Sequence, residues 1–376
     1  MLDVIIIGSG PYGISLAAHA LGNGLSYKIF GYPMDFWKNQ MPQDMFIRTP
    51  HDFVSFSDPE DKWTVHQFAA ETGIQLVTPL PRTIFTQYAS WFAEKAGIIF
   101  TPQLITHVSF KEGIYEVVSD SGEKHFARNV VVATGVEHYK YLPEMVKNFS
   151  PKLVSHTSGY TDFSAFKDKK VIVLGSGQSA WEAAGLLKRE GAEVELVYRA
   201  ASPNYAGSRE AEIELRDLGN VFFHLTDDEK KEEWGQSPGS IAHFLKPYVD
   251  GIVPQRANVQ IQQIKEQDGQ LLLKLSDGTE KLADHLLSAS GFHIDLDKAY
   301  FINAELREQI DREQSFSQFP RLSESFESNI PGLYFAGPLS SHSHGPTFRF
   351  ILGLRKTACS IISGITETKE KKIALI

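Results

Sequence analysis

The sequence contains a single cysteine, Cys359, among 376 residues. One thiol cannot close an intrachain disulfide, so nothing in the chain requires an oxidising compartment, and an internal dithiol redox centre is excluded. A lipase-type GxSxG motif is also absent. His342 and His344 lie two residues apart without a cysteine or carboxylate at ligand spacing, so we expect no metal site and place both histidines beside the active-site pocket instead.

Positive charge and long apolar runs are scarce as well. The chain has 37 Lys and Arg against 46 Asp and Glu, a net charge of −9, which disfavours binding to nucleic acid or anionic lipid. No run reaches the 18 or more apolar residues of a membrane span, and the short N-terminal run at residues 4–7 has no basic flank that would mark a signal peptide. We therefore expect a cytoplasmic enzyme-sized protein with two or three domains, without a membrane span or nucleic-acid partner.

Four short β-rich apolar runs, each followed closely by glycine, predict buried parallel strands. They cover residues 4–7, 130–133, 171–174 and 333–336. The first and third lead through glycine-rich turns into alanine-rich helical segments and then into further strands at residues 27–30 and 194–198. Residues 105–128 and 260–282 alternate as antiparallel strands, and residues 82–97 have a helical pattern. The chain thus contains two βαβ units.

The first turn, GSGPYG, has the glycine spacing of a dinucleotide-binding loop. Gly8 permits the tight turn, Gly10 leaves space for a pyrophosphate, and Gly13 permits close helix packing. The helix N-terminus that follows favours an anion. We expect a dinucleotide to contact this loop, which comprises Gly8, Ser9, Gly10, Pro11, Tyr12 and Gly13.

The second turn repeats this pattern in GSGQSA, with Ala180 in place of the third glycine. The expected contact residues are Gly175, Ser176, Gly177, Gln178 and Ser179. Two such sites indicate one resident cofactor and one that exchanges, because a hydride carrier must come and go while its acceptor stays. The alternative is a diverged second fold that binds no nucleotide.

The strand end after each turn distinguishes nucleotides: an acid binds an adenosine ribose, whereas arginine accommodates a 2′-phosphate. The two positions hold Gly31 and Arg199. Arg199, assisted by Arg209, predicts NADPH at the second site, although a solvated arginine at a strand end is the alternative. At the first site the group that holds the ribose in place of an acid at Gly31 is not identified by the sequence.

Taken together, these motifs resemble those of the flavin-containing monooxygenases and the related N-hydroxylating monooxygenases that act on ornithine or lysine. GSGPYG resembles their FAD fingerprint and GSGQSAWEA their NADPH fingerprint. VVVATG resembles a linker strand, LLSASGF its second copy, and IPGLYFAGPL the C-terminal FAD strand, with Pro338 where many relatives carry Asp. Further cofactor-contacting residues implied by the resemblance are Ala133, Thr134, Gly135, Ser290, Gly291 and Gly337.

The resemblance implies an α/β fold with two dinucleotide-binding, Rossmann-like domains, in which the NADPH domain is inserted in a discontinuous FAD domain. The implied boundaries are residues 1–160 and 293–376 for the FAD domain and residues 161–292 for the NAD(P)H domain. FAD and NADPH are the implied cofactors. A homodimer is one open option for the assembly.

The resemblance also implies roles near the flavin. Residues 33–46 occupy the place of a segment that covers the flavin, where Trp37, Met41 and Met45 would pack on the ring, although such residues also serve simply as core. In HGPTFRFILGLRKTA a helix is expected to begin at Pro346 and to direct its N-terminus at the flavin, with contacts from Pro346, Thr347 and Phe348.

FSPKLVSHTSGY matches the hydroxylase signature of the flavin-containing monooxygenases at His156 and Tyr160, whereas Phe149 lies one place early and Lys152 replaces a glycine. These two residues are the catalytic candidates. The alternative for His156 is a domain-junction residue bonded to backbone.

The resemblance favours an NADPH-dependent FAD monooxygenase that oxygenates a small nucleophilic substrate, an amine, sulfide or ketone, with molecular oxygen through a flavin hydroperoxide. The alternative is an NAD(P)H-dependent flavoprotein reductase or oxidase that passes electrons to an external acceptor. A flavin-binding scaffold without turnover is a third class, which the intact second turn and Arg199 disfavour.

Overall fold

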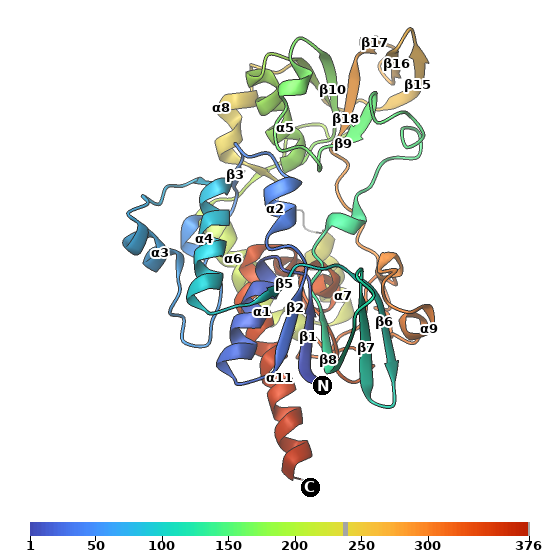
Figure 1. Ribbon diagram of the computed structural model, residues 1–376. Coiled ribbons are helices and arrows are strands. Elements are labelled where there is room, and N and C mark those ends of the chain that lie inside the picture. Colours follow the sequence, from blue (N-terminus) through green and yellow to red (C-terminus); the bar gives the residue numbers. More distant parts are fainter. Residues whose placement is uncertain (236–239, 375–376) are drawn as a thin grey trace.

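The computed structural model describes residues 1–235 and 240–374, which form two units stacked along the long axis of the molecule (Figure 1). The first unit contains a seven-stranded sheet in the order β5-β2-β1-β8-β7-β6, with β19 paired to β8. Its strands are β1 (Leu2–Ile7), β2 (Tyr27–Phe30), β5 (Phe100–Thr101), β6 (Ile105–Lys111), β7 (Ile114–Ser119), β8 (Lys124–Val132) and β19 (Leu333–Phe335).

The centre of this sheet is parallel and buried. β1 lies between β2 and β8, and β19 joins β8, all in parallel register. Helix α1 (Pro11–Gly22) packs on β1 and β2 and also against the C-terminal helix α11 (Leu354–Ala374). The apolar runs at residues 4–7, 130–133 and 333–336 are buried from end to end, which confirms the strands predicted there.

The second unit has a five-stranded parallel sheet in the order β14-β11-β10-β18-β9, and a separate three-stranded antiparallel sheet, β15-β16-β17. Helix α5 (Gln178–Arg189) follows β10 and packs on β10 and β11. The strands are β9 (Val154–His156), β10 (Lys170–Leu174), β11 (Glu193–Val197), β14 (Gln255–Arg256), β15 (Ile261–Gln267), β16 (Gln270–Leu275), β17 (Glu280–Ala283) and β18 (His285–Ser288). The chain leaves and re-enters the first unit around this sheet, so the predicted fold class, two Rossmann-like units with the second inserted in the first, is confirmed.

Shorter elements complete the two units. The remaining helices are α2 (Asp35–Asn39), α3 (Val65–Thr72), α4 (Arg82–Lys95), α6 (Arg209–Val221), α7 (Asp227–Gly235), α8 (Lys246–Val249), α9 (Ala304–Glu308) and α10 (Ser341–His344). The remaining strands are β3 (Phe46–Ile47), β4 (Leu80–Pro81), β12 (Tyr205–Ala206) and β13 (Ile241–Ala242). The 3₁₀ turns are η1 (His51–Phe53), η2 (Glu137–Tyr139), η3 (Ser164–Phe166), η4 (Phe222–His224), η5 (His243–Leu245), η6 (Leu296–Lys298), η7 (Gly337–Ser340), η8 (Pro346–Arg349) and η9 (Ile351–Gly353). None of the helices within residues 1–235 and 240–374 is long and apolar enough to cross a membrane.

Helices α6 and α7 lie against the first unit, although they fall within the predicted range 161–292 (Figure 1). The Thr347 hydroxyl donates to the Leu215 carbonyl, and Lys356 Nζ donates to the Gly219 carbonyl at 2.9 Å. Conversely, β9 belongs to the second sheet although it precedes residue 160. The sheets therefore divide the chain before Val154, and the segment 209–235 returns to the first unit.

The helix expected to begin at Pro346 begins at Leu354 instead. Residues 346–353 form the two 3₁₀ turns η8 and η9, separated by Phe350 in an extended conformation, with φ of −123° and ψ of 170°. Tyr12 favours the interruption, because its hydroxyl lies 3.0 Å from the Phe348 carbonyl and 2.8 Å from the Phe350 carbonyl and donates its one proton to an acceptor that a continuous helix would use. Pro346 does stand in the first turn of a helical segment, but that segment is a 3₁₀ turn, and the expected α-helix begins only at Leu354.

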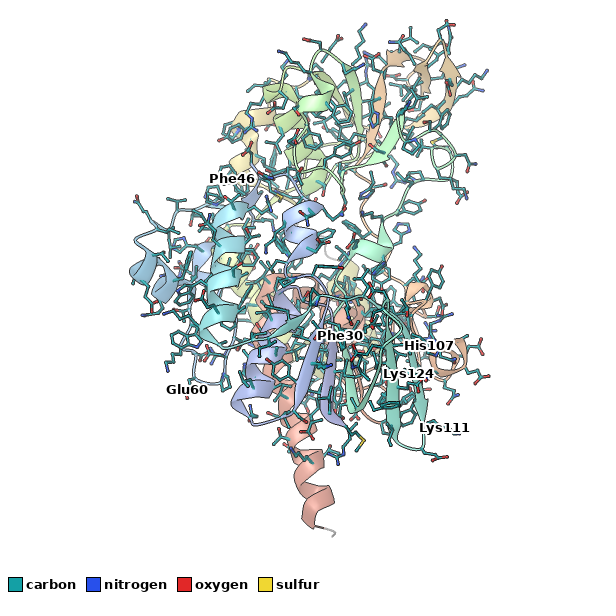
Figure 2. All side chains as sticks on the ribbon, viewed as in Figure 1. Phe30, Phe46, Glu60, His107, Lys111 and Lys124 are labelled. Atoms are coloured by element: carbon teal, nitrogen blue, oxygen red, sulfur yellow. The ribbon has the colours of Figure 1, made fainter. Side chains whose placement is uncertain are left out.

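The two units meet at the segment around Phe46, which Figure 2 labels at the level of their junction. The Phe46 ring contacts Phe244 edge-on, with centroids 5.8 Å apart. Gln43 N–H donates to the Thr161 carbonyl at 2.8 Å, and Arg189 and Asp44 form an ion pair at 2.5 Å. The segment expected to cover the flavin therefore also joins the units.

Candidate functional site

A cavity of about 710 Å³ opens at the carboxyl ends of the first sheet. Gly8, Gly31, Ala133 and Ala336, which follow β1, β2, β8 and β19, all lie on its wall. This is where ligands bind in parallel α/β sheets, and the volume is typical of a ligand pocket. The predicted cofactor residues that line it are Gly8, Ser9, Gly10, Pro11, Tyr12, Trp37, Met41, Met45, Ala133, Thr134, Gly135, Gln178 and Gly337.

The first glycine turn is packed against protein on two sides and open on the third. A Cβ at Gly8, where φ is +113°, would lie 2.2 Å from the Ala133 carbonyl oxygen, and one at Gly13 would lie 1.8 Å from the Gly8 carbonyl oxygen. A Cβ at Gly10 would meet no protein atom within 4 Å. Gly13 does not line the cavity, because it holds the helix against the turn. The residues therefore fit a pyrophosphate beside Gly10.

Arg82 holds the segment that carries Trp37 and Met45 over the cavity. Its side chain is buried, and it donates from Nε to the Pro42 carbonyl at 2.9 Å and from Nη1 to the Trp37 carbonyl. Its backbone N–H donates to the Met45 carbonyl at 3.0 Å. Burial lowers the pKa of Arg82, but an arginine stays protonated at neutral pH, and the Pro42 and Trp37 carbonyls replace the water that its guanidinium loses.

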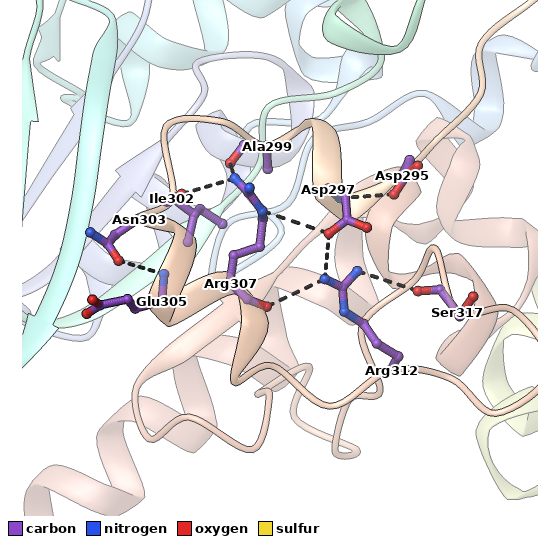
Figure 3. A network of polar contacts seen from close by, with 9 residues as sticks. All are labelled: Asp295, Asp297, Ala299, Ile302, Asn303, Glu305, Arg307, Arg312 and Ser317. Atoms are coloured by element: carbon purple, nitrogen blue, oxygen red, sulfur yellow. Dashed lines mark hydrogen bonds and ion pairs between the residues drawn. The ribbon is translucent and has the colours of Figure 1, made fainter.

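A loop after β18 supplies Lys298, Tyr300 and Phe301 to the cavity wall. Figure 3 shows the polar network behind this loop: Arg307 donates to the Ala299 and Ile302 carbonyls at 3.3 and 3.2 Å, and Arg312 donates to Asp297 at 2.8 Å. Because Asp297 is exposed, its ion pairs contribute less than about 1 kcal/mol each, so the network mainly positions the loop.

Gly31 shares the cavity wall with a buried, unpartnered amide oxygen. A Cβ at Gly31 would lie 2.8 Å from Ser9 Oγ, and the φ of +124° disfavours any side chain there. β5 pairs with β2 next to it, and two residues beyond β5 the Oε1 atom of Gln103 is buried on the cavity wall without a hydrogen-bond partner among the described residues. Sequence reasoning missed Gln103, because only the pairing of β5 with β2 brings it to the cavity wall.

The second glycine turn differs at its middle glycine, which has a protein side chain nearby. A Cβ at Gly175 would lie 2.7 Å from the Ala289 carbonyl oxygen, and one at Gly177 would lie 3.6 Å from Ser240 Oγ. Gln178 bridges outward: its Oε1 accepts from Ala242 N–H at 2.8 Å, and its Nε2 donates to Glu182 at 3.0 Å. Of the residues predicted at this turn, only Gln178 reaches the cavity, and Gly175, Ser176, Gly177 and Ser179 do not line it.

Arg199 and Arg209 are not brought together. Arg199 is exposed just beyond β11 and forms no ion pair with a residue that the structure describes. Arg209 begins α6 on the first unit, where it pairs with Asp52 at 2.6 Å. Ser290 and Gly291 lie on the return linker, where the Ser290 hydroxyl donates to the Tyr141 carbonyl and Gly291 O accepts from Tyr141 N–H at 3.1 Å.

His156 and Tyr160 lie at the junction of the units and do not line the cavity. His156 Nε2 donates to the Gly291 carbonyl at 3.0 Å, while Nδ1 accepts from Ser158 N–H at 3.0 Å. Burial lowers the pKa of His156, which agrees with a neutral ring in this tautomer. Tyr160 hydrogen-bonds to Ser155 Oγ at 2.8 Å, and Ser155 in turn contacts His285 at 2.7 Å.

The cofactor-contacting residues predicted near the C-terminus lie just outside the cavity wall. Pro346, Thr347 and Phe348 do not line it, whereas the next residues, Arg349, Phe350 and Ile351, do. His342 and His344 also lie off its wall, inside an aromatic cluster, so their expected place at the pocket edge is wrong. Within residues 1–235 and 240–374, no three His, Cys, Asp or Glu side chains gather as metal ligands.

Sequence comparison places residues 1–239 in the profile of the L-lysine 6-monooxygenase/L-ornithine 5-monooxygenase family. The chain is 25% identical over 208 residues to ferredoxin–NADP reductase 1 of Bacillus mycoides, a match that covers 53% of this chain and 51% of that protein. It therefore spans about half the length of that curated relative.

Solved structures match over nearly the whole chain. DfoA bound to FAD, a cadaverine monooxygenase from Erwinia amylovora, is 20% identical with a TM-score of 0.82, covering 98% of this chain and 95% of that one. The ornithine N-hydroxylase KtzI of Kutzneria sp. 744, solved with reduced FAD, NADP+ and L-ornithine, is 18% identical with a TM-score of 0.81, covering 98% and 100%. Because these sequence identities are low, the solved structures establish only the fold. Membership of the family rests on the match of residues 1–239 to the family profile. The chain belongs to the L-lysine 6-monooxygenase/L-ornithine 5-monooxygenase family of FAD-dependent NAD(P)H oxidoreductases.

Proposed function

We propose that this protein is an NADPH-dependent FAD monooxygenase that oxygenates a small nucleophilic substrate, an amine, sulfide or ketone. The observation that carries the proposal is the cavity at the first glycine turn, where Gly10 leaves space for a pyrophosphate and Gln103 presents an unpartnered buried oxygen. Bound FAD would supply the redox chemistry, accepting a hydride from NADPH and activating dioxygen once reduced.

The chain's own residues would hold that cofactor in place. Gly8, Gly10 and Gly13 form the pyrophosphate loop, and Gln103 accepts a hydrogen bond from the adenosine ribose in place of the acid that Gly31 cannot supply. Arg82 fixes the covering segment, so that Trp37 and Met45 exclude water from the reacting end.

The second glycine turn is the proposed NADPH site, with Arg199 as the partner of the 2′-phosphate. NADPH would enter between the units, next to the junction that His156 and Tyr160 support. We propose that these two residues position the linkers rather than transfer protons, because both ring nitrogens of His156 are bonded to backbone.

The competing function is a reductase that passes electrons to an external acceptor, which the partial match to a ferredoxin–NADP reductase favours. The two are separated by supplying FAD-loaded protein with NADPH and isotopically labelled dioxygen, using L-ornithine, L-lysine, cadaverine, a sulfide and a ketone as probes. A monooxygenase incorporates one labelled oxygen atom per NADPH into a probe. Reduction of ferricyanide or ferredoxin without incorporation into any of these probes would contradict the proposal.

A further inference from the structure

One residue belongs to both of the proposed cofactor sites. Gln178 begins α5 directly after Gly177 of the second glycine turn, and it also lines the cavity at the first turn. Its amide is bonded at both ends: the Ala242 N–H donates to Oε1 at 2.8 Å, and Nε2 donates to Glu182 Oε2 at 3.0 Å. Because a backbone N–H can only donate, Oε1 must face Ala242, which leaves Nε2 to face Glu182. Ala242 and Glu182 together fix the orientation of this amide.

Glu182 also binds the segment that lies over the cavity. It follows Gln178 by one helical turn on the same face of α5, and its carboxyl accepts a hydrogen bond from the Phe46 backbone N–H. Phe46 lines the cavity, and the carbonyl of its neighbour Met45 accepts from the Arg82 backbone N–H at 3.0 Å. A single carboxyl therefore joins the second glycine turn to the segment over the first.

Hydrogen bonding accounts for this carboxyl better than packing does. Glu182 is 6% exposed and forms no ion pair with a residue that the structure describes. An acid buried without a cation is costly, and an apolar side chain of similar volume would pack there at lower cost. Burial raises the pKa of Glu182 to about 8, so the carboxyl carries a proton at neutral pH and acts there as a neutral acceptor. A glutamine amide, which is neutral as well, can accept the same two hydrogen bonds.

We propose that Glu182 is a positioning residue for hydride transfer from NADPH to FAD. This rests on the proposed function, in which the second turn holds NADPH and the cavity holds FAD. The transfer moves one hydride and leaves NADP+ and the reduced flavin anion, and Glu182 exchanges no proton in it. Glu182 acts through Gln178 and the Phe46 backbone, which it holds in a fixed relative position. A displacement of about 1 Å at such a junction can cost about a hundredfold in rate.

The test compares Glu182→Leu, Glu182→Gln and Gln178→Leu as purified, FAD-loaded proteins. Anaerobic reduction by NADPH, followed by stopped-flow absorbance, separates the rate at saturation from the half-saturating concentration. The change in the flavin absorbance spectrum on addition of NADP+ is the second measurement and requires no turnover. Arg189→Gln is the matched control, because Arg189 also lies on α5 and pairs with Asp44 of the same segment, but at an exposed position off the cavity wall.

Glu182→Leu should keep its flavin and its half-saturating NADPH concentration but lose about ten- to a hundredfold in the saturated rate, with a weaker spectral response to NADP+. Glu182→Gln should stay within about threefold of the native rate, because it keeps both acceptor bonds. Gln178→Leu should lose as much as Glu182→Leu, and the double variant should be no slower than either, because both side chains act through one amide. Arg189→Gln should keep the native rate.

A native saturated rate in Glu182→Leu overturns the inference. An equal loss in Arg189→Gln overturns it as well, because it would indicate a general loosening of the junction, and so does a loss in Glu182→Gln as large as in Glu182→Leu. If Glu182→Leu does not fold or retain flavin, Gln178→Leu decides: a native rate in that variant overturns the inference.

The unsubstituted protein separates this inference from the proposed function. If NADPH does not reduce its flavin, the proposed function fails. If NADPH reduces its flavin and that of Glu182→Leu equally fast, only the present inference fails.

Discussion

The two glycine turns have related sequences but different surroundings. At the first, the position of Gly10 is open and the turn forms the wall of a large cavity; at the second, Gly177 faces Ser240 at 3.6 Å, and only Gln178 reaches that cavity. Segments that are distant in sequence share the cavity wall with the first turn, whereas the second lies in the unit with the smaller sheet. The difference suits a cofactor that stays at the first turn and one that exchanges at the second.

The largest expected effect is at Gly13. In Gly13→Val the Cβ atom would lie 1.8 Å from the Gly8 carbonyl oxygen, which neither backbone segment can relieve without moving the helix from the strand. We expect a loss of more than about 4 kcal/mol in the free energy of unfolding. Chemical denaturation followed by circular dichroism measures it. A variant of near-native stability would show that the turn is not packed as described.

The second turn is tested through Arg199. A charge-assisted bond to the 2′-phosphate contributes about 1.5 to 3 kcal/mol, so NADPH should be favoured over NADH by roughly ten- to a hundredfold. Arg199→Ala should erase most of that preference in the half-saturating concentrations for flavin reduction. Arg209→Ala is the control variant, because Arg209 pairs with Asp52 on the first unit and should leave the NADPH preference unchanged. An unchanged NADPH-to-NADH ratio in Arg199→Ala would remove this residue from the site.

The stability of the folded protein should depend on pH through Glu182, which lies next to the segment that joins the two units. This side chain is buried on α5, accepts hydrogen bonds from Gln178 and from the Phe46 backbone, and burial raises its pKa to about 8. Since the unfolded carboxyl titrates near 4.5, the folded protein binds the extra proton between these values, and stability falls as pH rises through them. The slope is roughly 1 kcal/mol per pH unit. Glu182→Gln should lose this part of the pH dependence in thermal unfolding at pH 5.5 and 7.5, and parallel curves would contradict it.

The smallest effect concerns His156. If His156 only positions the linkers between the units, His156→Ala should slow flavin reduction by NADPH. The pH profile of that rate should then keep any ionisation near the ordinary histidine pKa of roughly 6.5. Burial lowers the pKa of His156 in the folded protein, and both ring nitrogens already have backbone partners. Reductive rates between pH 5.5 and 8.5 for both proteins provide the measurement. Loss of one ionisation in the variant would instead indicate proton transfer.

Hydrophobic patterns and glycine turns in the sequence predicted the strands and helices that depend on neighbouring residues alone. The buried strands at residues 4–7 and 171–174 and the helices after them follow from apolar runs and glycine turns. What those rules missed depends on distant partners. The helix expected at Pro346 is interrupted where the hydroxyl of Tyr12, far away in sequence, lies within hydrogen-bond distance of the Phe348 and Phe350 carbonyls. Gln103 lies in no motif, and only the pairing of β5 with β2 places it on the cavity wall.

The most direct test of the central claim compares Gly10→Val with Gly177→Val, since both backbones accept a side chain without a positive φ. We expect Gly10→Val to fold but to be purified without flavin. We expect Gly177→Val to keep a full flavin complement by absorbance but no longer to be reduced by NADPH under anaerobic conditions. A yellow Gly10→Val, or a Gly177→Val that is reduced by NADPH at the native rate, would contradict the assignment of the resident cofactor to the first turn and the exchanging one to the second.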